Sequence, residues 1–372
     1  MRRLKIEKYI NMYLNNYKDY KSEWNYEDGC ILIGAESLYK ATKDKRYLDF
    51  ILNYLDKRID KNGAIDNLNP VEYNIDNINS GRVLFTAFEE TKNEKYKKAI
   101  ESVKYLLTIH PRTLEGNFWH KGRYPYQVWL DGLYMAQPFY TIYSNENRDE
   151  NGLKDILNQF KNVRKNLFCE DKKLYFHGFD ETKTMNWANK ETGRSKNFWG
   201  RAVGWYAMAL VDVIENIDET IFKSYKDQFV SLYVELMEGI VQYQDESGLW
   251  YQVMGLEKRE GNYLETSATL MFAYSLLKGN RLNILDESYL EKGKKALNAV
   301  IDNNLKENNG NLELTNICIM AGLNGLIPFN GDRDGSFEYY ISEKIGVDDP
   351  KGVGPLFKVY SEVVLLDNKG GY

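Results

Sequence analysis

Apolar residues recur with the 3.6-residue period of an α-helix along most of the chain. Between residues 94 and 109, the positions that share one face are Tyr96, Ile100, Val103 and Leu107. Between residues 152 and 166, they are Leu153, Ile156, Leu157, Phe160 and Val163. No long run alternates apolar and polar residues, and the short stretches 174–179 and 248–254 predict hairpin arms inside loops. The pattern therefore predicts a mainly helical protein.

The predicted helices are of two kinds, which alternate along the chain. One kind has little charge and many small residues, and its members begin near residues 27, 76, 128, 200, 263 and 354. The other kind is charged on one face, and its members lie near 2–15, 46–59, 94–109, 151–166, 222–243 and 289–305. Weakly charged helices suit an inner ring, and amphipathic helices suit an outer ring with one wet face. Six such hairpins predict an all-α fold, an (α/α)6 toroid.

Polar and aromatic residues cluster where the inner helices are predicted to begin. The clusters lie at 24–29, 73–82, 124–132, 197–205, 262–267 and 349–355. In a toroid these helix starts converge at one end of the barrel, and the loop-like segment 329–354 is expected to fold back onto that end. No low-complexity linker divides the sequence, so one domain over residues 1–372 is predicted.

Charge and composition narrow the classes of function. The net charge is −5, which disfavours a nucleic-acid partner because a polyanion usually needs a basic face. The 29 tyrosines and 7 tryptophans favour sugars or aromatic ligands. Cys30, Cys169 and Cys318 are too far apart and too few for a disulfide framework or a metal site. The N-terminus lacks the apolar core of a signal peptide, and no run reaches the length of a membrane span. A cytoplasmic protein without a membrane partner is therefore expected; the oligomeric state is not readable.

One carboxylate, Asp131, lies among aromatic residues in the segment HKGRYPYQVWLDGLYMAQPF, residues 120–139. The rings around it in sequence are His120, Tyr124, Tyr126, Trp129 and Tyr134. Apolar surroundings disfavour a charged carboxyl, so the pKa of Asp131 is expected to rise and the group to serve as a proton donor. The alternative is a plain helix N-cap, a position that aspartate favours.

A second carboxylate, Asp76, occupies the corresponding place before the preceding inner helix. Its alternative role is again that of an N-cap. Two acids at matching positions of neighbouring hairpins are more informative than either one, because paired carboxylates carry out glycosidic chemistry. Asp76 and Asp131 are therefore the catalytic candidates.

The remaining candidates are substrate-binding. His177 lies in a predicted loop and could donate to a ligand, although an isolated histidine is more often structural. Arg201 lies between Trp199 and Trp205, where it can pack by cation–π contact or bind a carboxylate as a fork. Lys351 could instead be a solvated surface residue. The clusters at the helix starts add Trp24, Trp129 and Trp205, and the segment 120–139 adds His120. Three scattered histidines and the missing phosphate-loop pattern predict neither a metal nor a cofactor.

These segments resemble glycoside hydrolase family 105, the unsaturated rhamnogalacturonyl hydrolases. The resemblance rests on RYPYQVWLDGLYMAQPF, LYFHGFD, TGRSKNFWGRAVGW and GSFEYYISEKIGVDDPKGVGP, which follow the family's order. It implies an α/α six-hairpin barrel, with Asp131 as general acid and base and Asp76 as the second active-site aspartate. It also implies that the sugar subsite is lined by His120, His177, Arg201 and Trp205.

The resemblance implies a hydrolase that removes a terminal unsaturated galacturonyl residue from rhamnogalacturonan or pectin fragments by hydrating its C4=C5 bond. The expected substrate is a small oligosaccharide such as an unsaturated disaccharide. Family 88, the unsaturated glucuronyl hydrolases, is a more distant likeness and a first alternative. An ordinary inverting glycosidase that uses Asp76 and Asp131 is a second, and a non-catalytic sugar-binding protein is a third. The sugar next to the uronate is not predicted.

Overall fold

The computed structural model describes residues 1–326, 332–368 and 370, and it is a toroid of paired helices. The inner helices are α2 (Tyr26–Thr42), α4 (Arg82–Thr91), α6 (Leu130–Glu146), α8 (Gly200–Asn216), α10 (Thr266–Arg281) and α13 (Pro350–Asn368). The outer helices are α1 (Arg2–Asn15), α3 (Lys45–Arg58), α5 (Glu94–Ile109), α7 (Glu150–Leu167), α9 (Glu219–Ile240) and α11 (Glu287–Asn303). The predicted (α/α)6 toroid is confirmed.

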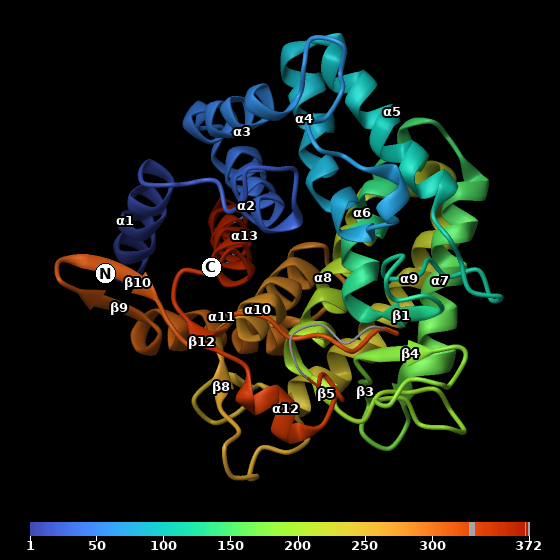
Figure 1. The fold of residues 1–372 in the computed structure, drawn as a ribbon. Helices are drawn as coiled ribbons and strands as arrows, with labels where there is room; N and C mark the ends of the chain where they lie inside the picture. The colour runs from blue at the N-terminus through green and yellow to red at the C-terminus, as the bar shows by residue number, and fades with distance from the viewer. Residues whose placement is uncertain (327–331, 369, 371–372) are drawn as a thin grey trace.

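The inner helices close into a ring. Each packs against its neighbours in chain order, and the last inner helix, α13, packs against the first, α2 (Figure 1). The red end of the chain therefore lies beside the blue beginning. This closure brings the starts of helices that are far apart in sequence to the same end of the barrel.

Burial follows the two kinds of sequence. Residues 200–214 of α8 are all buried, whereas the outer helices bury only one face. Outer helices begin at side chains that accept a hydrogen bond from the first turn, namely Asp44, Asn93, Asp149, Asp218 and Asp286. Such caps satisfy backbone N–H groups that have no partner inside the helix. The outer helices therefore carry charged or polar residues both on their solvent-exposed face and at their N-termini.

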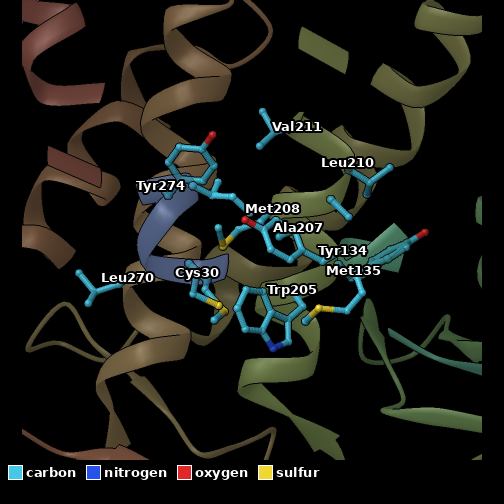
Figure 2. Close-up of a cluster of buried hydrophobic side chains, with 14 of the residues drawn as sticks. Cys30, Tyr134, Met135, Trp205, Ala207, Met208, Leu210, Val211, Leu270 and Tyr274 are labelled. Carbon is cyan, nitrogen blue, oxygen red and sulfur yellow. The ribbon is translucent and has the colours of Figure 1, made fainter. Parts of the chain in front are cut away.

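A continuous hydrophobic core runs from Ile6 in the first helix to Leu366 in the last. Figure 2 shows a part of this core, in which the ring of Trp205 stacks on Tyr134 with centroids 4.7 Å apart. Met135 from α6 and Cys30 from α2 lie in the same cluster. The core is consistent with one domain, and the boundaries 1–372 stay a prediction.

Short strands tie together the loops that precede the inner helices. β1 (Gln127–Trp129) pairs with β4 (Gly178–Asp180), β5 (Phe198–Trp199) with β7 (Val253–Met254), and β6 (Trp250–Tyr251) with β8 (Leu264–Glu265). The remaining loop pairs are β2 (Phe168–Cys169) with β3 (Leu174–Tyr175) and β11 (Ile317–Cys318) with β12 (Ile345–Gly346). The predicted strand segments at 174–179 and 248–254 are present, but each divides into two strands with different partners. Pairing between loops makes the site end of the barrel rigid.

Two local features differ from the sequence-based expectation. The inner helix expected from residue 76 starts as a 3₁₀ segment, η2 (Ile75–Gly81), before α4 begins. A hairpin of β9 (Leu305–Asn308) and β10 (Asn311–Leu314) was not predicted. Its turn is Asn309-Gly310, and both residues have positive φ, 49° and 81°. Asn-Gly is the preferred pair for such a two-residue turn.

The short elements η1 (Pro70–Glu72), η3 (Val241–Tyr243) and α12 (Phe337–Ser342) complete the described chain. Helix α12 belongs to the segment expected to fold back onto the barrel, of which residues 329–331 lie outside the described residues. Tyr340 of α12 packs against His177, so this part of the segment lies where it was expected. Within the described residues, no helix combines the length and apolar character needed to cross a membrane.

Candidate active site

The starts of five inner hairpins meet around one cavity of about 310 Å³. Each contributes one of the predicted residues, which are Trp24 before α2, Asp76 in η2, Asp131 in α6, Arg201 in α8 and Lys351 in α13. His120, Trp129 and Trp205 also line the cavity. Residues separated by more than 300 positions in the chain therefore share one wall, as the toroid predicts.

Asp131 lies in the first turn of α6 but is not its cap. The N-cap position belongs to Trp129, which makes no side-chain cap. The Asp131 side chain keeps 14% of its surface exposed, and its Oδ2 atom lies 3.2 Å from Nε2 of His177. That distance allows an ionic contact, but both atoms lack a well-angled hydrogen bond. Asp131 thus faces the cavity with unused hydrogen-bonding capacity.

The pKa of Asp131 differs in direction from the sequence-based prediction. Burial does raise the pKa of this carboxyl, as the aromatic surroundings suggested. The N–H of His177 and the nearby His120 favour the charged form more strongly, so the pKa lies below its ordinary value. The predicted rise is wrong for the free protein, because composition around the acid does not reveal where imidazole donors point.

Asp76 forms an ion pair with Lys121, whose Nζ contacts its Oδ2 atom. Asn74, not Asp76, caps η2 by accepting from the backbone N–H of Asp76. Burial would lower the pKa of Lys121, but the charge of Asp76 outweighs it and raises that pKa. The N-cap alternative is therefore wrong for both acids. The sequence-based reasoning missed Lys121, although it directly follows His120 in the key segment.

Aromatic rings build the wall beside Asp131. The imidazole of His120 stacks on the indole of Trp129, with centroids 4.1 Å apart and planes 17° apart. Trp129 is held by its Nε1–H, which donates to Gln127 over 3.0 Å. Burial lowers the pKa of His120 to about 4, so this ring is neutral near pH 7. On the opposite rim, Nε1–H of Trp24 donates to the backbone oxygen of Asn77 over 2.8 Å.

Arg201 is 1% exposed and combines both roles considered from the sequence. Its guanidinium carbon lies 4.7 Å from the ring centroid of Trp199, which is the cation–π contact. Its Nη1 donates to the backbone oxygen of Cys318 and, over 3.4 Å, to Ser267. The group still lines the cavity, so one side remains available to an anion. Trp205 lies deeper, at 2% exposure.

Lys351 is not the solvated surface residue that was the leading alternative. It is 4% exposed, and its Nζ lies 2.9 Å from Asp349 at the start of α13. The ammonium also lies 5.5 Å from the ring centroid of Tyr20. The glycine-rich neighbours gave only a weak signal, because the burying partners come from the far end of the chain.

His177 is fully buried and is not among the residues that line the cavity. Its backbone oxygen accepts from the N–H of Leu130, which fixes it beside the start of α6. Its Nδ1 lies 2.7 Å from the hydroxyl of Tyr340. His177 therefore reaches a ligand only through Asp131. Sequence-based reasoning missed Tyr340 and also Arg333, a buried cavity residue, because neither has a local pattern that marks it.

Among the described residues, no three or more histidine, cysteine, aspartate or glutamate side chains are grouped closely enough to hold a metal ion. The cavity is lined by the carboxylates of Asp131 and of Asp76, which is paired with Lys121, and also by those of Glu23, Glu27 and Glu72, together with neutral and cationic donors. Rings on its walls can stack on a sugar. This set can exchange a proton with a carbohydrate and bind an acidic group on it.

Comparison with known proteins matches this geometry. The model of Glycosyl Hydrolase Family 88 covers residues 5–366. A solved structure of a glycoside hydrolase from family 105 of C. acetobutylicum is 42% identical, with a TM-score of 0.89. That match covers 97% of this chain and 98% of the other.

Two further relatives extend the comparison. The unsaturated rhamnogalacturonyl hydrolase YesR of Bacillus subtilis is 27% identical over 292 residues, 75% of this chain and 76% of the relative. The unsaturated glucuronyl hydrolase of Bacillus sp. GL1 covers 100% of this chain and 98% of its own at 13% identity, with a TM-score of 0.69. At that identity the second likeness concerns the fold alone.

Proposed function

Because the chain belongs to Glycosyl Hydrolase Family 88 and, through its 42% identical structural relative, to family 105, we propose that it hydrolyses unsaturated uronyl oligosaccharides. The proposed substrate is a small fragment of rhamnogalacturonan or pectin that ends in a 4,5-unsaturated galacturonyl residue. The name of the relative YesR supports this class of substrate. The chain is a glycoside hydrolase, and the leaving sugar is left open.

The unsaturated residue is an enol ether, which reacts by hydration. Addition of a proton to C4 places positive charge on C5 and the ring oxygen. Water then attacks C5 and gives up a proton, which forms a hemiketal. The hemiketal opens to a ketone, and the neighbouring sugar leaves with its glycosidic oxygen. One group can deliver the first proton and accept the second, so no nucleophilic side chain is required.

Asp131 is the proposed acid and base. It faces the cavity, and in the free protein its pKa lies below the ordinary value because the His177 N–H outweighs burial. A uronate in the cavity adds negative charge and excludes water, and both effects raise the pKa of a carboxyl. Substrate binding therefore supplies the proton-holding state that the free protein lacks.

Asp76 is proposed to hold the substrate instead of exchanging protons. Its carboxylate is occupied by the ion pair with Lys121. This contrast between the two carboxylates is the observation that carries the proposal. An ordinary inverting glycosidase needs a second free carboxylate to activate water, and Lys121 occupies the only other predicted one. Arg201 and Lys351 are proposed as the cations that attract the substrate carboxylate.

The test of the reaction class uses an unsaturated galacturonyl-rhamnose disaccharide and the purified protein. We expect loss of the ultraviolet absorbance of the conjugated uronate without added metal. Activity that disappears on chelation and returns with one metal ion would contradict the metal-free form of the proposal. An unsaturated glucuronyl disaccharide serves as the comparison substrate for the first alternative.

Isotopes separate hydration from ordinary hydrolysis. In heavy water, deuterium should appear at C4 of the product. In oxygen-18 water, the label should enter at C5, and the released sugar should keep its unlabelled glycosidic oxygen. Label at C1, or cleavage of the saturated disaccharide at a comparable rate, would overturn the mechanism in favour of an inverting glycosidase. A cytoplasmic location, with imported fragments as substrate, is part of the same proposal.

A further inference from the structure

Behind Asp131 lies a second layer of polar groups. His177 stands between Asp131 and Tyr340, with Nε2 facing Asp131 Oδ2 at 3.2 Å and Nδ1 facing the Tyr340 hydroxyl at 2.7 Å. His177 and Tyr340 are both fully buried. The imidazole ring is clamped between Trp129 and Trp199, with ring centroids 5.4 Å and 4.9 Å away. The ring cannot turn without displacing an indole.

The Tyr340 hydroxyl decides which imidazole nitrogen carries the hydrogen. A neutral imidazole has one N–H donor and one acceptor nitrogen. Among the residues that the structure describes, the Tyr340 hydroxyl makes no other hydrogen bond. If Nδ1 were the donor, the hydroxyl hydrogen would be buried without an acceptor, which is unfavourable. The hydroxyl therefore donates to Nδ1, and the hydrogen of His177 sits on Nε2.

We propose that Tyr340 is a positioning residue, which holds His177 with its hydrogen on Nε2 and so keeps the Asp131 proton on Oδ1. This inference rests on the proposed function. The Nε2–H group faces Oδ2, which is buried and cannot take the proton without a clash of two hydrogens. Oδ1 is the oxygen left to the cavity. The proton of the acid is thereby aimed at the substrate and not at the protein.

The support for Tyr340 is itself rigid. Its ring stacks on Trp199, with planes 18° apart, and its backbone oxygen accepts from Gln252 over 3.1 Å. Several titratable groups face this layer from neighbouring elements. They are His120 and Asp76 at the cavity, Asp334 before α12, Tyr339 within α12, and Cys318. Any pH profile must be compared between variants that keep all of these groups.

The direct test is the tautomer of His177 in the free protein. The chain has three histidines, so selective ¹⁵N labelling of histidine gives a spectrum that the His110→Gln and His120→Gln variants assign. We expect the neutral imidazole of His177 to carry its hydrogen on Nε2. In Tyr340→Phe, the other tautomer should become detectable. A hydrogen on Nδ1 in the unmodified protein, or no change in Tyr340→Phe, would overturn the proposal.

The kinetic test uses Tyr340→Phe with Tyr233→Phe as the matched control. Tyr233 is also fully buried, and its hydroxyl donates to the backbone of Ser275 away from the cavity. Loss of one hydrogen bond that biases the tautomer should lower kcat of Tyr340→Phe about 3- to 10-fold, with KM little changed. The second tautomer lets Asp131 place its proton on Oδ2, an unproductive form.

The pH profile distinguishes positioning from simple damage. The unproductive protonated form should move the alkaline limb of kcat to higher pH while it lowers the plateau. Tyr233→Phe should keep the limb in place. An unmoved limb in Tyr340→Phe would contradict the proposal. Failure of the proposed function would show differently, because the unmodified protein would then leave the uronate absorbance unchanged. The tautomer of His177 is measured without substrate, so its result does not depend on turnover.

Discussion

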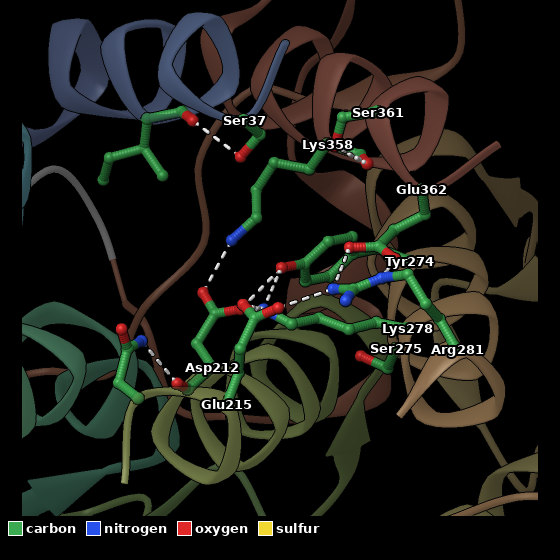
Figure 3. Close-up of polar contacts among 12 residues, drawn as sticks. Ser37, Asp212, Glu215, Tyr274, Ser275, Lys278, Arg281, Lys358, Ser361 and Glu362 are labelled. Atoms are coloured by element: carbon green, nitrogen blue, oxygen red, sulfur yellow. Dashed lines mark hydrogen bonds and ion pairs between the residues drawn. The ribbon is translucent and has the colours of Figure 1, made fainter. Parts of the chain in front are cut away.

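Two aspartates on the same inner ring, Asp131 in α6 and Asp212 in α8, differ in how their oxygens are used. Asp131 at the cavity has its Oδ2 atom beside one imidazole and lacks a well-angled bond. Asp212 in α8 is fully buried, and each of its oxygens accepts two hydrogen bonds. Figure 3 shows those from Tyr274, Lys278 and Lys358. Asp131 can therefore still accept hydrogen bonds, whereas every oxygen of Asp212 already has two partners.

The saturation of Asp212 is complete and mostly ionic. Oδ1 accepts from the Tyr274 hydroxyl at 2.6 Å and from Lys278 at 2.7 Å. Oδ2 accepts from Arg82 at 2.7 Å and from Lys358 at 2.6 Å. Burial would raise the pKa of Asp212, but the three cations outweigh it and hold that pKa well below its ordinary value. Such a group keeps a fixed charge.

The contrast shows that the two ends of an inner helix carry polar groups with different roles. Helix α8 carries Arg201 at its start and Asp212 eleven residues later, about 16 Å along the helix axis. Helix α13 carries Lys351 and Lys358 in the same order. Polar groups near the helix starts keep unused capacity for a ligand, whereas those near the barrel centre bind one another. The comparison therefore predicts that function and stability respond to different residues.

Asp131→Asn should produce the largest effect on turnover. The amide keeps the shape of the side chain but can neither deliver nor retrieve a proton. General acid–base groups contribute about 100- to 10,000-fold, and a loss of that size is expected in kcat. The free energy of unfolding should change by less than about 1 kcal/mol, because the Asp131 side chain is partly exposed and its Oδ2 atom lacks a well-angled hydrogen bond. Absorbance assays and urea unfolding measure both quantities.

One outcome would contradict the prediction for Asp131. A folded Asn variant with turnover near that of the unmodified protein would remove Asp131 from the mechanism. Asp76→Asn gives a second reference point. Its loss should affect binding and rate together, because it also releases Lys121.

Asp212→Asn should have the opposite pattern, with a large loss of stability. It leaves Arg82, Lys278 and Lys358 buried without their shared anion. Breaking a buried ionic network by removing one partner costs about 3–5 kcal/mol in the free energy of unfolding. Urea unfolding measures the loss. Asp227→Asn is the matched control, because its pair with Lys223 is exposed and should contribute about 1 kcal/mol or less. Equal effects of the two substitutions would show that the network is not a stability element.

The fold was largely predictable from the sequence, and the reason is periodicity. Each outer helix lies within three residues of its predicted bounds, because charge on one face marks it locally, and α3, α5, α7, α9 and α11 also begin at an Asp or Asn cap. The hairpin at Asn309-Gly310 was missed although its turn has a sequence signature. The helix predicted over 289–305 overlaps the first residue of β9, and the strand signal there is short.

The site was predictable only in part. Residues within the aromatic segment, such as Asp131 and His120, were found because they are neighbours in sequence. Tyr340 was missed because only the return of α12 brings it to His177. The pKa direction of Asp131 was wrong because it depends on the orientation of one N–H group. Local sequence therefore identifies candidate residues, but the pKa of a candidate depends on contacts between distant parts of the chain.

Arg201→Lys should have an intermediate effect. It tests whether the cavity needs the planar geometry of a guanidinium or only a positive charge. Lysine keeps the cation but loses the planar fork that pairs two donors with a carboxylate. KM for the uronate substrate should rise about tenfold, which corresponds to about 1.4 kcal/mol. KM for a carboxyl-reduced analogue should change little. Equal losses on both substrates would show that Arg201 only supports Trp199 and Cys318.

Lys358→Met should act on the pH dependence of stability, and it tests the comparison from the side of the saturated carboxylate. Burial, reinforced by Arg82 and Lys278, lowers the pKa of Lys358 to about 7, despite the attraction of Asp212. In the unfolded chain the pKa of lysine is about 10.4. Between these values the unfolded state binds more protons, so the stability of the unmodified protein should rise with pH, by at most about 1.4 kcal/mol per unit. In Lys358→Met that rise should be lost, while Asp212 keeps Arg82 and Lys278 as partners. Urea unfolding at pH 7, 8.5 and 10 measures the slope, and an unchanged slope in the variant would assign the titration to another group.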